Sequence, residues 1–513
     1  MSELMPKYGE NRAITGGQYD KFLAVKCING TFVGQRKENV LSFKGIPYVG
    51  QQPVGPLRWK APAAFTPDSG VYEAYHYGKS PVQSPGDPAS LYPMGEDCLT
   101  LNLWKADDAA TGKPVVVWIY GGAFEVGGTT DPQYDCHNLV QEFPDVIFVT
   151  VNYRVSFLGF FHLAHLADGK DYQDAPNLGL MDQMMALRWV RENIAAFGGD
   201  PENVTIWGES AGGASCALLP LVKGSHQYFH RAIIQSGSPS QTRSPEQAIV
   251  CTDKVLEALG CKTVADLMQV SAEKLAEVWT GLYGFFQKLG IRTFPERDGV
   301  YLPLDTWKAY EDGAAKDIEF LQGCNKDEMN TFLGVVGKDV WNAWADARLE
   351  EKLAQLTDKE KDLVKSYCAD IPGERCEATV RIAGQIMFIA PQIRLSEAQA
   401  KAGGKSYTYY YTVESAVPMI KSGHASELSV VFNHPEFTDF TGRAIDETFC
   451  KAMRRMWIQF ARTGRPSPEW PLYDSKDKQV MVLDEFDIHP AKESELKIVD
   501  WDRTLFLTRY YML

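Results

Sequence analysis

Four short runs of apolar residues constrain the fold of this chain more than any other feature. Each run is continuous rather than alternating, which is typical of a strand buried on both faces. Strands of this kind occur in the parallel sheets of α/β proteins. The runs are residues 114–120 (PVVVWIY), 146–153 (VIFVTVNY), 204–207 (VTIW) and 232–235 (AIIQ).

A helical pattern separates the second run from the third. In residues 177–194, leucine, methionine and valine side chains recur at the spacing of one helix face. A helix between two parallel strands is a crossover connection. The alternation therefore predicts an α/β fold, with a large, mostly parallel, twisted sheet that is flanked by helices.

The second half of the chain is predicted to extend this sheet. Residues 318–321 and 407–412 have strand character, and residues 447–460 form an amphipathic helix that ends before Gly464. Two helical, charged blocks, around 244–288 and 337–390, are interpreted as insertions. The 513 residues would allow about three domains. Since no repeat or linker divides them, we expect one domain over residues 20–513, after a leader at 1–19 that is no signal peptide.

Charge and cysteine content exclude several classes of partner. The 52 Lys and Arg against 66 Asp and Glu give a net charge of −14, which disfavours nucleic acid and anionic membranes. No apolar stretch is long enough for a membrane span. Ten cysteines without a C-x-x-C pair predict free thiols, no metal and no cofactor. We expect a cytoplasmic protein, and the oligomeric state stays open.

The most specific local motif is G-x-S-x-G at residues 208–212 (GESAG). It directly follows the 204–207 strand and precedes a helical run, as in the nucleophile elbow of serine hydrolases. The motif would present Ser210 outward at a helix N-terminus, where the N–H of Ala211 stabilises negative charge. The alternative is that Ser210 is only a helix N-cap.

A glycine-rich strand end supplies a second feature of acyl-transfer chemistry. Residues 121–124 (GGAF) follow the 114–120 strand, and small residues there let backbone N–H groups approach a substrate oxygen. The alternative is a simple tight turn.

Histidines outside these motifs have plainer interpretations. His226 and His230 stand four apart on a possible helix face, but no third ligand or H-E-x-x-H motif accompanies them. A solvated or capping role is favoured over a metal pair. His162 and His165 follow an apolar strand and are interpreted as loop or core residues.

Several motifs together resemble the type-B carboxylesterase and cholinesterase family of α/β-hydrolases, over residues 20–505. They occur in the order that the family has. They are Phe43-x-Gly45-Ile46-Pro47-Tyr48, Pro53-Val54-Gly55-Pro56-Leu57-Arg58, Glu96-Asp97-Cys98-Leu99-x-Leu101-Asn102, Gly198-Gly199-Asp200-Pro201, GESAGG at 208–213, Asn325-Lys326-Asp327-Glu328 and His424-Ala425-Ser426-Glu427-Leu428.

The resemblance implies a role for each of several residues. Ser210 would be the nucleophile, Glu328 the acid and His424 the general base. Without the family, Glu328 would not stand out among the acidic residues. The resemblance also implies oxyanion-hole N–H donors at Gly122, Ala123 and Ala211, with Glu209 and Ser236 supporting His424 from a second layer.

Three departures from the family pattern refine these expectations. Ala123 replaces a third glycine, so it is expected to take an ordinary L-residue conformation and to narrow the hole. Cys98 lacks its partner in the disulfide of secreted relatives, since residues 28–97 contain no cysteine. Cys251 and Cys261 align roughly with another family disulfide, and we favour reduced thiols. The cation-binding tryptophan of cholinesterases is absent from residues 84–92, unless Tyr92 substitutes for it.

The sequence thus predicts a serine carboxylesterase that cleaves small to medium uncharged esters through an acyl-enzyme. Its partner is a small-molecule ester substrate. Triad chemistry alone also allows amides, carbamates or lactones. A binding protein of cholinesterase type is the remaining alternative, and it is disfavoured because the three triad residues are all present.

Overall fold

The four apolar runs form neighbouring strands in the middle of one large sheet. The computed structural model describes residues 4–289, 292–343, 357–358 and 375–496. Within them the runs lie in β9 (Lys113–Ile119), β10 (Ile147–Val151), β11 (Gly199–Glu209) and β12 (Arg231–Gln235). These strands are parallel, in the order β10, β9, β11, β12. The predicted parallel sheet is confirmed.

The full sheet has eleven strands in the order β16-β15-β14-β13-β12-β11-β9-β10-β8-β4-β3 within the described residues. Strands from β10 to β15 are parallel, and antiparallel strands lie at both edges. Its other strands are β3 (Gln35–Lys37), β4 (Val40–Pro47), β8 (Thr100–Ala106), β13 (Glu319–Asn325), β14 (Ser406–Tyr411), β15 (Gln479–Leu483) and β16 (Ile488–Lys492). Two small sheets consist of β1 (Ala24–Cys27), β2 (Asn29–Val33) and β5 (Asp68–Glu73), and of β6 (Ser80–Pro81) and β7 (Met94–Gly95).

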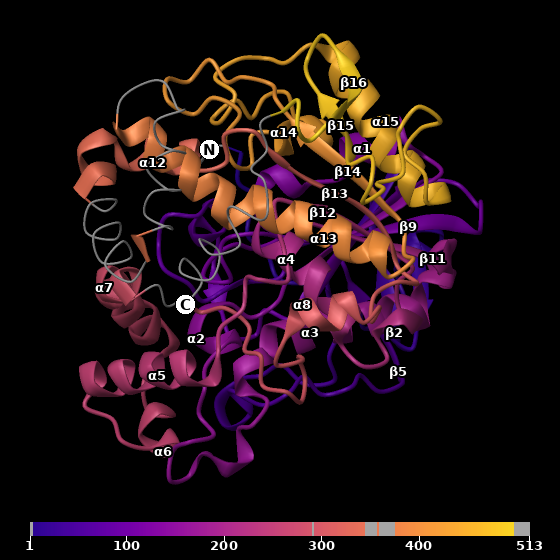
Figure 1. Ribbon diagram of the computed structural model, residues 1–513. Helices are drawn as coiled ribbons and strands as arrows, with labels where there is room; N and C mark the ends of the chain where they lie inside the picture. Colours follow the sequence, from indigo (N-terminus) through magenta and orange to yellow (C-terminus); the bar gives the residue numbers. More distant parts are fainter. Residues whose placement is uncertain (1–3, 290–291, 344–356, 359–374, 497–513) are drawn as a thin grey trace.

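Helices cover the sheet, as Figure 1 shows. Helix α4 packs on β11 and β12, α13 on β13 and β14, and α15 on β9 and β11. No helix in the described ranges combines the length and hydrophobicity that a membrane span requires. The helices are α1 (His137–Glu142), α2 (Ser156–Gly159), α3 (Leu178–Asn193), α4 (Ala211–Leu218), α5 (Pro245–Leu259), α6 (Val264–Leu267), α7 (Ala272–Leu289), α8 (Thr306–Glu311), α9 (Asn330–Val336), α12 (Arg375–Gly384), α13 (Ala390–Lys401), α14 (Leu428–Val431) and α15 (Glu447–Thr463), with a π-helical turn over Gln385–Ile389.

The predicted crossover helix and C-terminal helix are both present, as α3 and α15. Helix α15 begins after Asp446, whose carboxylate accepts hydrogen bonds from the first turn, and ends at Gly464 with φ 78°. The helical block at 244–288 is present as α5, α6 and α7, which form one end of the molecule in Figure 1. The block at 337–390 lies partly outside the described residues, and α12 and the π-helical turn belong to its described part.

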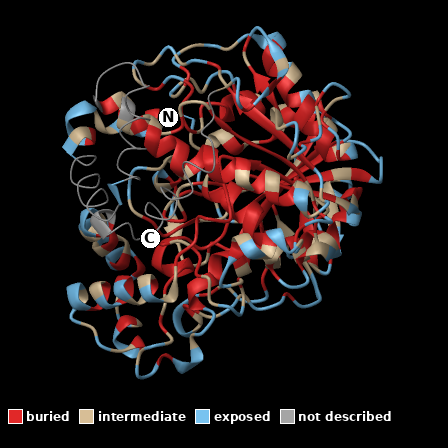
Figure 2. Ribbon diagram, viewed as in Figure 1, coloured by how far each residue is buried: buried red, intermediate tan, exposed pale blue. Residues whose placement is uncertain are grey.

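The core follows the central strands, which are buried almost throughout in Figure 2, whereas α5 and α6 expose much of their surface. Three aromatic rings contact one another there. Trp207 of β11 stacks on Phe432 with ring centroids 4.7 Å apart, and Trp118 of β9 meets both rings edge-on. Because Phe432 follows α14, this cluster fixes the segment after residue 424 to the sheet.

A buried ion pair anchors α3 to the end of β10. Arg154 follows that strand, and its guanidinium donates to the carboxylate of Asp182 at 2.7 and 2.8 Å. The side chains are 3% and 0% exposed, so the two charges are separated from water. Removing one partner of such a pair strongly destabilises the fold, because the other charge is then buried without a counter-charge.

We predict that Arg154→Met destabilises the protein by about 3–5 kcal/mol, since Asp182 loses its counter-charge. Urea-induced unfolding followed by intrinsic fluorescence measures the loss. The matched control is Arg188→Met on α3, the helix that carries Asp182. It breaks a surface ion pair with Glu192 and is expected to cost no more than about 0.5 kcal/mol. Equal midpoints for the two variants would contradict the role given to the buried pair.

Candidate active site

Ser210 lies at a sharp turn between β11 and α4. It has φ 56° and ψ −120°, in the region that L-residues avoid, and its N–H donates to the carbonyl of Gln235 at 2.8 Å. Ser210 is half-buried, whereas Glu209 is 4% and Ala211 1% exposed. Its hydroxyl makes no capping hydrogen bond to α4. The N-cap interpretation is therefore not supported, and the turn has the geometry of a nucleophile elbow.

The elbow depends on two glycines because backbones pass very close there. A Cβ atom at Gly208 would overlap the carbonyl group of Gly212, and one at Gly212 would overlap the carbonyl oxygen of Ile119 in β9. Backbone cannot yield as a flexible side chain can. The spacing G-x-S-x-G is thus required by the approach of α4 to both strands.

The residues after β9 form a left-handed turn beside Ser210. A Cβ atom on Gly121 would stand 3.1 Å from that of Ser210, which shows how closely the turn passes. The φ angles of Gly122, Ala123 and Phe124 are 106°, 57° and 61°. The expectation of an ordinary conformation for Ala123 is wrong, because this turn imposes a conformation that glycine normally takes.

Several backbone N–H groups around Ser210, among them those of Phe124, Gly212 and Gly213, have no hydrogen-bond acceptor within the described part of the chain. Gly122, Ala123 and Ala211 also belong to this group. Ala211 is the first residue of α4, where the helix dipole adds positive potential. The same three residues are the ones for which oxyanion contacts were expected from the sequence.

His424 and Glu328 form the closest charged contact of the site. Nδ1 of His424 lies 2.5 Å from Oε2 of Glu328, although 96 positions separate them in the sequence. Oε1 of the same carboxylate accepts hydrogen bonds from the hydroxyl of Ser236 at 2.6 Å and the N–H of Asn325 at 2.7 Å. Glu328 follows β13 and His424 follows β14, so neighbouring parallel strands bring them together.

A second carboxylate lies close to the other nitrogen of the imidazole. Nε2 of His424 lies 3.0 Å from Oε1 of Glu209, the residue before Ser210. No hydrogen bond joins His424 to Ser210, both of which are described. Burial lowers the pKa of His424, but attraction to Glu209 and Glu328 outweighs it and raises the pKa well above the ordinary value. The imidazolium form is therefore favoured in this arrangement.

Sequence reasoning assigned no role to a third buried carboxylate behind this pair. Glu427 accepts hydrogen bonds from Asn325 at 2.6 Å and from Gln235 at 2.8 Å. Burial, together with repulsion from Glu209, raises the pKa of Glu427 to about 7. Position in the motifs was the available signal: Asn325 lies three residues before Glu328, and Glu427 lies three residues after His424.

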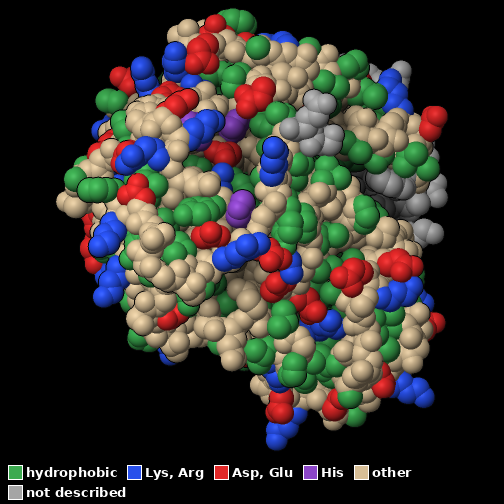
Figure 3. Space-filling view, turned by 180° about the vertical axis from the view of Figure 1, so that it is seen from behind, with side chains coloured by type: hydrophobic (Ala, Val, Ile, Leu, Met, Phe, Trp, Pro, Cys, Tyr) green, Lys and Arg blue, Asp and Glu red, His purple; other side chains and the backbone are tan. Residues whose placement is uncertain are grey.

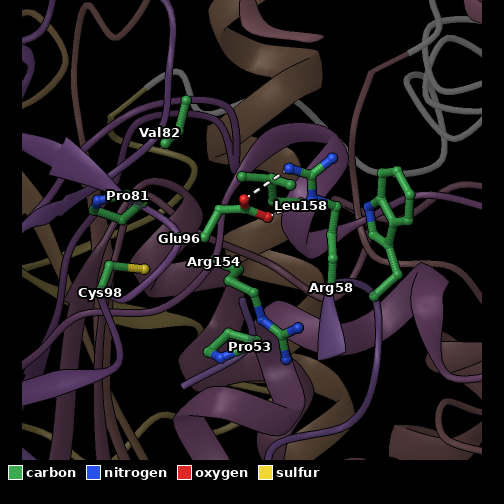
Figure 4. Close-up of a pocket in the computed structure, with 9 residues that line it drawn as sticks. Pro53, Arg58, Pro81, Val82, Glu96, Cys98, Arg154 and Leu158 are labelled. Carbon is green, nitrogen blue, oxygen red and sulfur yellow. Dashed lines mark hydrogen bonds and ion pairs between the residues drawn. The ribbon is translucent and has the colours of Figure 1, made fainter. Parts of the chain in front are cut away.

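Other histidines and the pocket in Figure 4 lie apart from this arrangement. His226 is in a 3-10 turn and His230 precedes β12, so the possible helix face that they were to share does not exist. The described residues contain no cluster of His, Cys, Asp or Glu that could hold a metal. The pocket in Figure 4, around the Arg58–Glu96 ion pair, is lined by none of the predicted site residues.

The fold and the site together define an α/β-hydrolase. A mostly parallel sheet carries an elbow serine after β11, and an acid and a histidine follow β13 and β14 at the same edge.

Comparison with known proteins specifies the family. The chain belongs to the carboxylesterase family, whose model matches residues 21–497. It is 35% identical to the para-nitrobenzyl esterase of Bacillus subtilis over 490 residues, which cover 91% of this chain and 96% of that one. It is 31% identical to the cholinesterase of Mus musculus over 488 residues, with coverage of 86% and 79%.

Solved structures agree with this assignment. The carboxylesterase of Geobacillus stearothermophilus superposes with a TM-score of 0.82 at 33% identity, over 93% of this chain and 99% of that one. A structure of PNB esterase gives the same TM-score at 32% identity. The protein is thus a serine carboxylesterase that hydrolyses carboxylic esters, and the resemblance inferred from its motifs is confirmed.

We predict that Glu209→Gln shifts the pH dependence of ester hydrolysis. The general base that the family resemblance implies at His424 must be neutral, so kcat/KM should rise as pH rises through the pKa of His424. Loss of the charge 3.0 Å from Nε2 lowers that pKa. The acidic limb of the kcat/KM profile should therefore move to lower pH.

The control is Glu202→Gln, which removes a 65% exposed carboxylate from the same strand. Its acidic limb should coincide with that of the unaltered enzyme. A limb that stays in place in Glu209→Gln, or that moves to higher pH, would contradict the electrostatic role of Glu209.

Proposed function

We propose that Ser210, His424 and Glu328 act as nucleophile, general base and acid in the hydrolysis of small to medium uncharged carboxylic esters. The observation that carries this proposal is the 2.5 Å contact between His424 and Glu328, at the sheet edge that also bears the elbow serine. The carboxylate orients the imidazole and stabilises its charge, as a triad requires. Ser236 and Asn325 hold the carboxylate in turn.

The reaction proceeds through two acyl transfers. His424 reacts as the neutral imidazole: Nε2 moves away from Glu209 and accepts the hydroxyl proton of Ser210, while Oγ attacks the ester carbonyl carbon. The imidazolium then donates this proton to the departing alkoxide, which leaves as the alcohol. Water then attacks the acyl-enzyme in the same way. His424 accepts a proton from the water as its oxygen adds to the carbonyl carbon, and then returns that proton to Oγ of Ser210 as the carboxylic acid leaves.

Backbone N–H groups stabilise the negative charge that forms on the carbonyl oxygen. Gly122, Ala123 and Ala211 are the proposed donors, and the absence of other acceptors for them in the described residues supports this role. Donors of this kind contribute about 3 kcal/mol each to stabilisation of the transition state. A preformed turn offers them without reorganisation during the reaction.

Uncharged esters are favoured because residues 84–92, where cholinesterases carry a cation-binding tryptophan, contain none. Tyr92 is 3% exposed, its ring packs edge-on against Tyr8 at 5.8 Å, and its hydroxyl donates to the carbonyl of Tyr77. This packing supports a structural role for Tyr92 and disfavours the alternative that it stacks on a substrate cation.

We also infer a cytoplasmic protein with one domain over residues 20–513 and no nucleic-acid or membrane partner. Among the described cysteines, Cys98, Cys251 and Cys261 are free thiols, which supports a reducing compartment. Acidic and basic side chains are interspersed on the face drawn in Figure 3, and the net charge of −14 disfavours polyanions. The central sheet takes strands from residue 35 to residue 492, which supports one domain.

We predict that Ser210→Ala lowers kcat for para-nitrophenyl acetate by about 10⁶-fold, as loss of a triad nucleophile does. The circular dichroism spectrum should stay unchanged, since the side chain makes no capping hydrogen bond. Ser215→Ala in α4 is the matched control and is expected to keep kcat within about threefold. Turnover by Ser210→Ala at the level of this control would overturn the assignment.

We predict a preference for a neutral leaving group over its cationic isostere. The pair is 3,3-dimethylbutyl thioacetate and acetylthiocholine, which differ in replacing a carbon by a charged nitrogen. The neutral ester should have the higher kcat/KM, by about tenfold or more, because the cation loses hydration without gaining the tryptophan face that cholinesterases offer. A higher kcat/KM for acetylthiocholine would refute the proposed substrate class.

A further inference from the structure

The left-handed turn after β9 needs support from its surroundings. Gly122, Ala123 and Phe124 have φ angles of 106°, 57° and 61°, and two of these residues carry a Cβ atom. A non-glycine residue pays a conformational free energy for such a φ, so the turn persists only where neighbouring groups hold it. Its exact placement matters, because Gly122 and Ala123 carry two of the proposed oxyanion donors.

Backbone hydrogen bonds close the turn but leave its orientation to side chains. The N–H groups of Glu125 and Val126 donate to the carbonyl of Gly122 at 2.9 and 3.0 Å. The N–H of Ser156 donates to the carbonyl of Phe124 at 2.7 Å. Glu125 is the first charged side chain after the turn.

The carboxylate of Glu125 is buried opposite a single arginine. The Glu125 side chain is 8% exposed, and its Oε1 lies 3.8 Å from Nη1 of Arg292. This oxygen accepts no hydrogen bond from any described residue. Arg292 in turn donates to the hydroxyl of Tyr283 at 3.0 Å. The attraction between the two charges acts at low dielectric, where it is strong and little screened by salt.

Arg292 belongs to a segment that is fixed independently of the turn. The buried guanidinium of Arg243 donates to the carbonyl oxygen of Arg292 at 3.3 Å. The backbone N–H of Arg243 donates to the carbonyl oxygen of Pro295 at 2.9 Å. The ring of Phe294 meets that of Phe124 at 5.9 Å. The turn therefore contacts the segment 292–297 through adjacent residues, one pair apolar and one pair charged.

We propose that Glu125 is a positioning residue for the oxyanion hole. Its carboxylate, opposite Arg292, ties the turn of residues 122–124 to segment 292–297 and so fixes the N–H groups of Gly122 and Ala123 relative to Ser210. The inference rests on the oxyanion roles proposed above for these groups. It adds a residue outside the triad on which transition-state stabilisation depends.

The principal test is Glu125→Gln, which keeps the shape of the side chain and removes its charge. With para-nitrophenyl acetate, kcat should fall by about 10- to 100-fold and KM should change less than twofold, since the donors act on the transition state. The affinity for an aryl trifluoromethyl ketone, which forms a hemiketal oxyanion on the nucleophile, should weaken by the same factor as kcat/KM.

Three further variants separate positioning from general stability. Glu96→Gln breaks another Arg–Glu pair, that of Arg58, and neither residue hydrogen-bonds to residues 121–126 in the described chain. Its kcat should stay within twofold of the unaltered enzyme. Arg292→Lys keeps the positive charge and should retain more than a third of kcat, whereas Arg292→Gln should lose as much as Glu125→Gln.

Several results would overturn the proposal. They are an unchanged kcat in Glu125→Gln, a change in KM alone, an unaltered affinity for the trifluoromethyl ketone, or an equal loss of kcat in Glu96→Gln. If Glu125→Gln fails to fold, the comparison of Arg292→Lys with Arg292→Gln decides in the same way. Failure of the proposed function is distinguished by Ser210→Ala, which would then keep the activity of the unaltered enzyme.

Discussion

The contact between the β11–α4 turn and the backbone of β9 is the constraint on which the rest of the site depends. Gly208 and Gly212 allow α4 to start against the carbonyl of Ile119, where any Cβ atom would overlap backbone. With this close packing, Ser210 has φ 56° and is half-buried, and its hydroxyl makes no capping hydrogen bond to α4. It also brings the turn after β9 alongside the serine. The proposed nucleophile and the start of the turn that carries two of the proposed oxyanion donors are thereby placed side by side by one packing arrangement of backbone.

Electrostatics around the imidazole form the second layer of the design. Glu209, Glu328 and Glu427 are buried within one network, and His424 is the cationic group that contacts two of them. Burial, together with repulsion from Glu209, raises the pKa of Glu427. Burial lowers the pKa of His424, but attraction to Glu209 and Glu328 outweighs it and raises that pKa. The imidazole thus has two neighbouring carboxylates. In the proposed reaction the ring must move so that Nε2 faces Ser210 instead of Glu209.

Local patterns predicted the elements that a short stretch of sequence determines. The buried strands, α3, α15 and the elbow at Ser210 follow from hydrophobic period and glycine spacing, which act within about 20 residues. Glu328 and His424 could not be found in this way, since they meet across 96 positions through parallel strand pairing. The family resemblance supplied them.

The misses have physical causes as well. Ala123 was expected in an ordinary conformation because the residue prefers it, but the packing of the turn overrides that preference. His226 and His230 have helical spacing in sequence, but His226 lies in a 3-10 turn and His230 directly precedes β12. Glu125 has no local motif, so only the three-dimensional contacts indicate its role. Glu427 lies in the motif of His424, but sequence reasoning assigned it no role.

The most direct measurement is the site of reaction with diethyl para-nitrophenyl phosphate. Peptide mass spectrometry after complete inactivation should locate one diethylphosphoryl group per chain, on Ser210, with one para-nitrophenolate released for each group. This outcome identifies the residue that attacks an electrophile while His424 accepts its proton. Inactivation with the label on another residue, or continued ester turnover by fully labelled protein, would contradict the account.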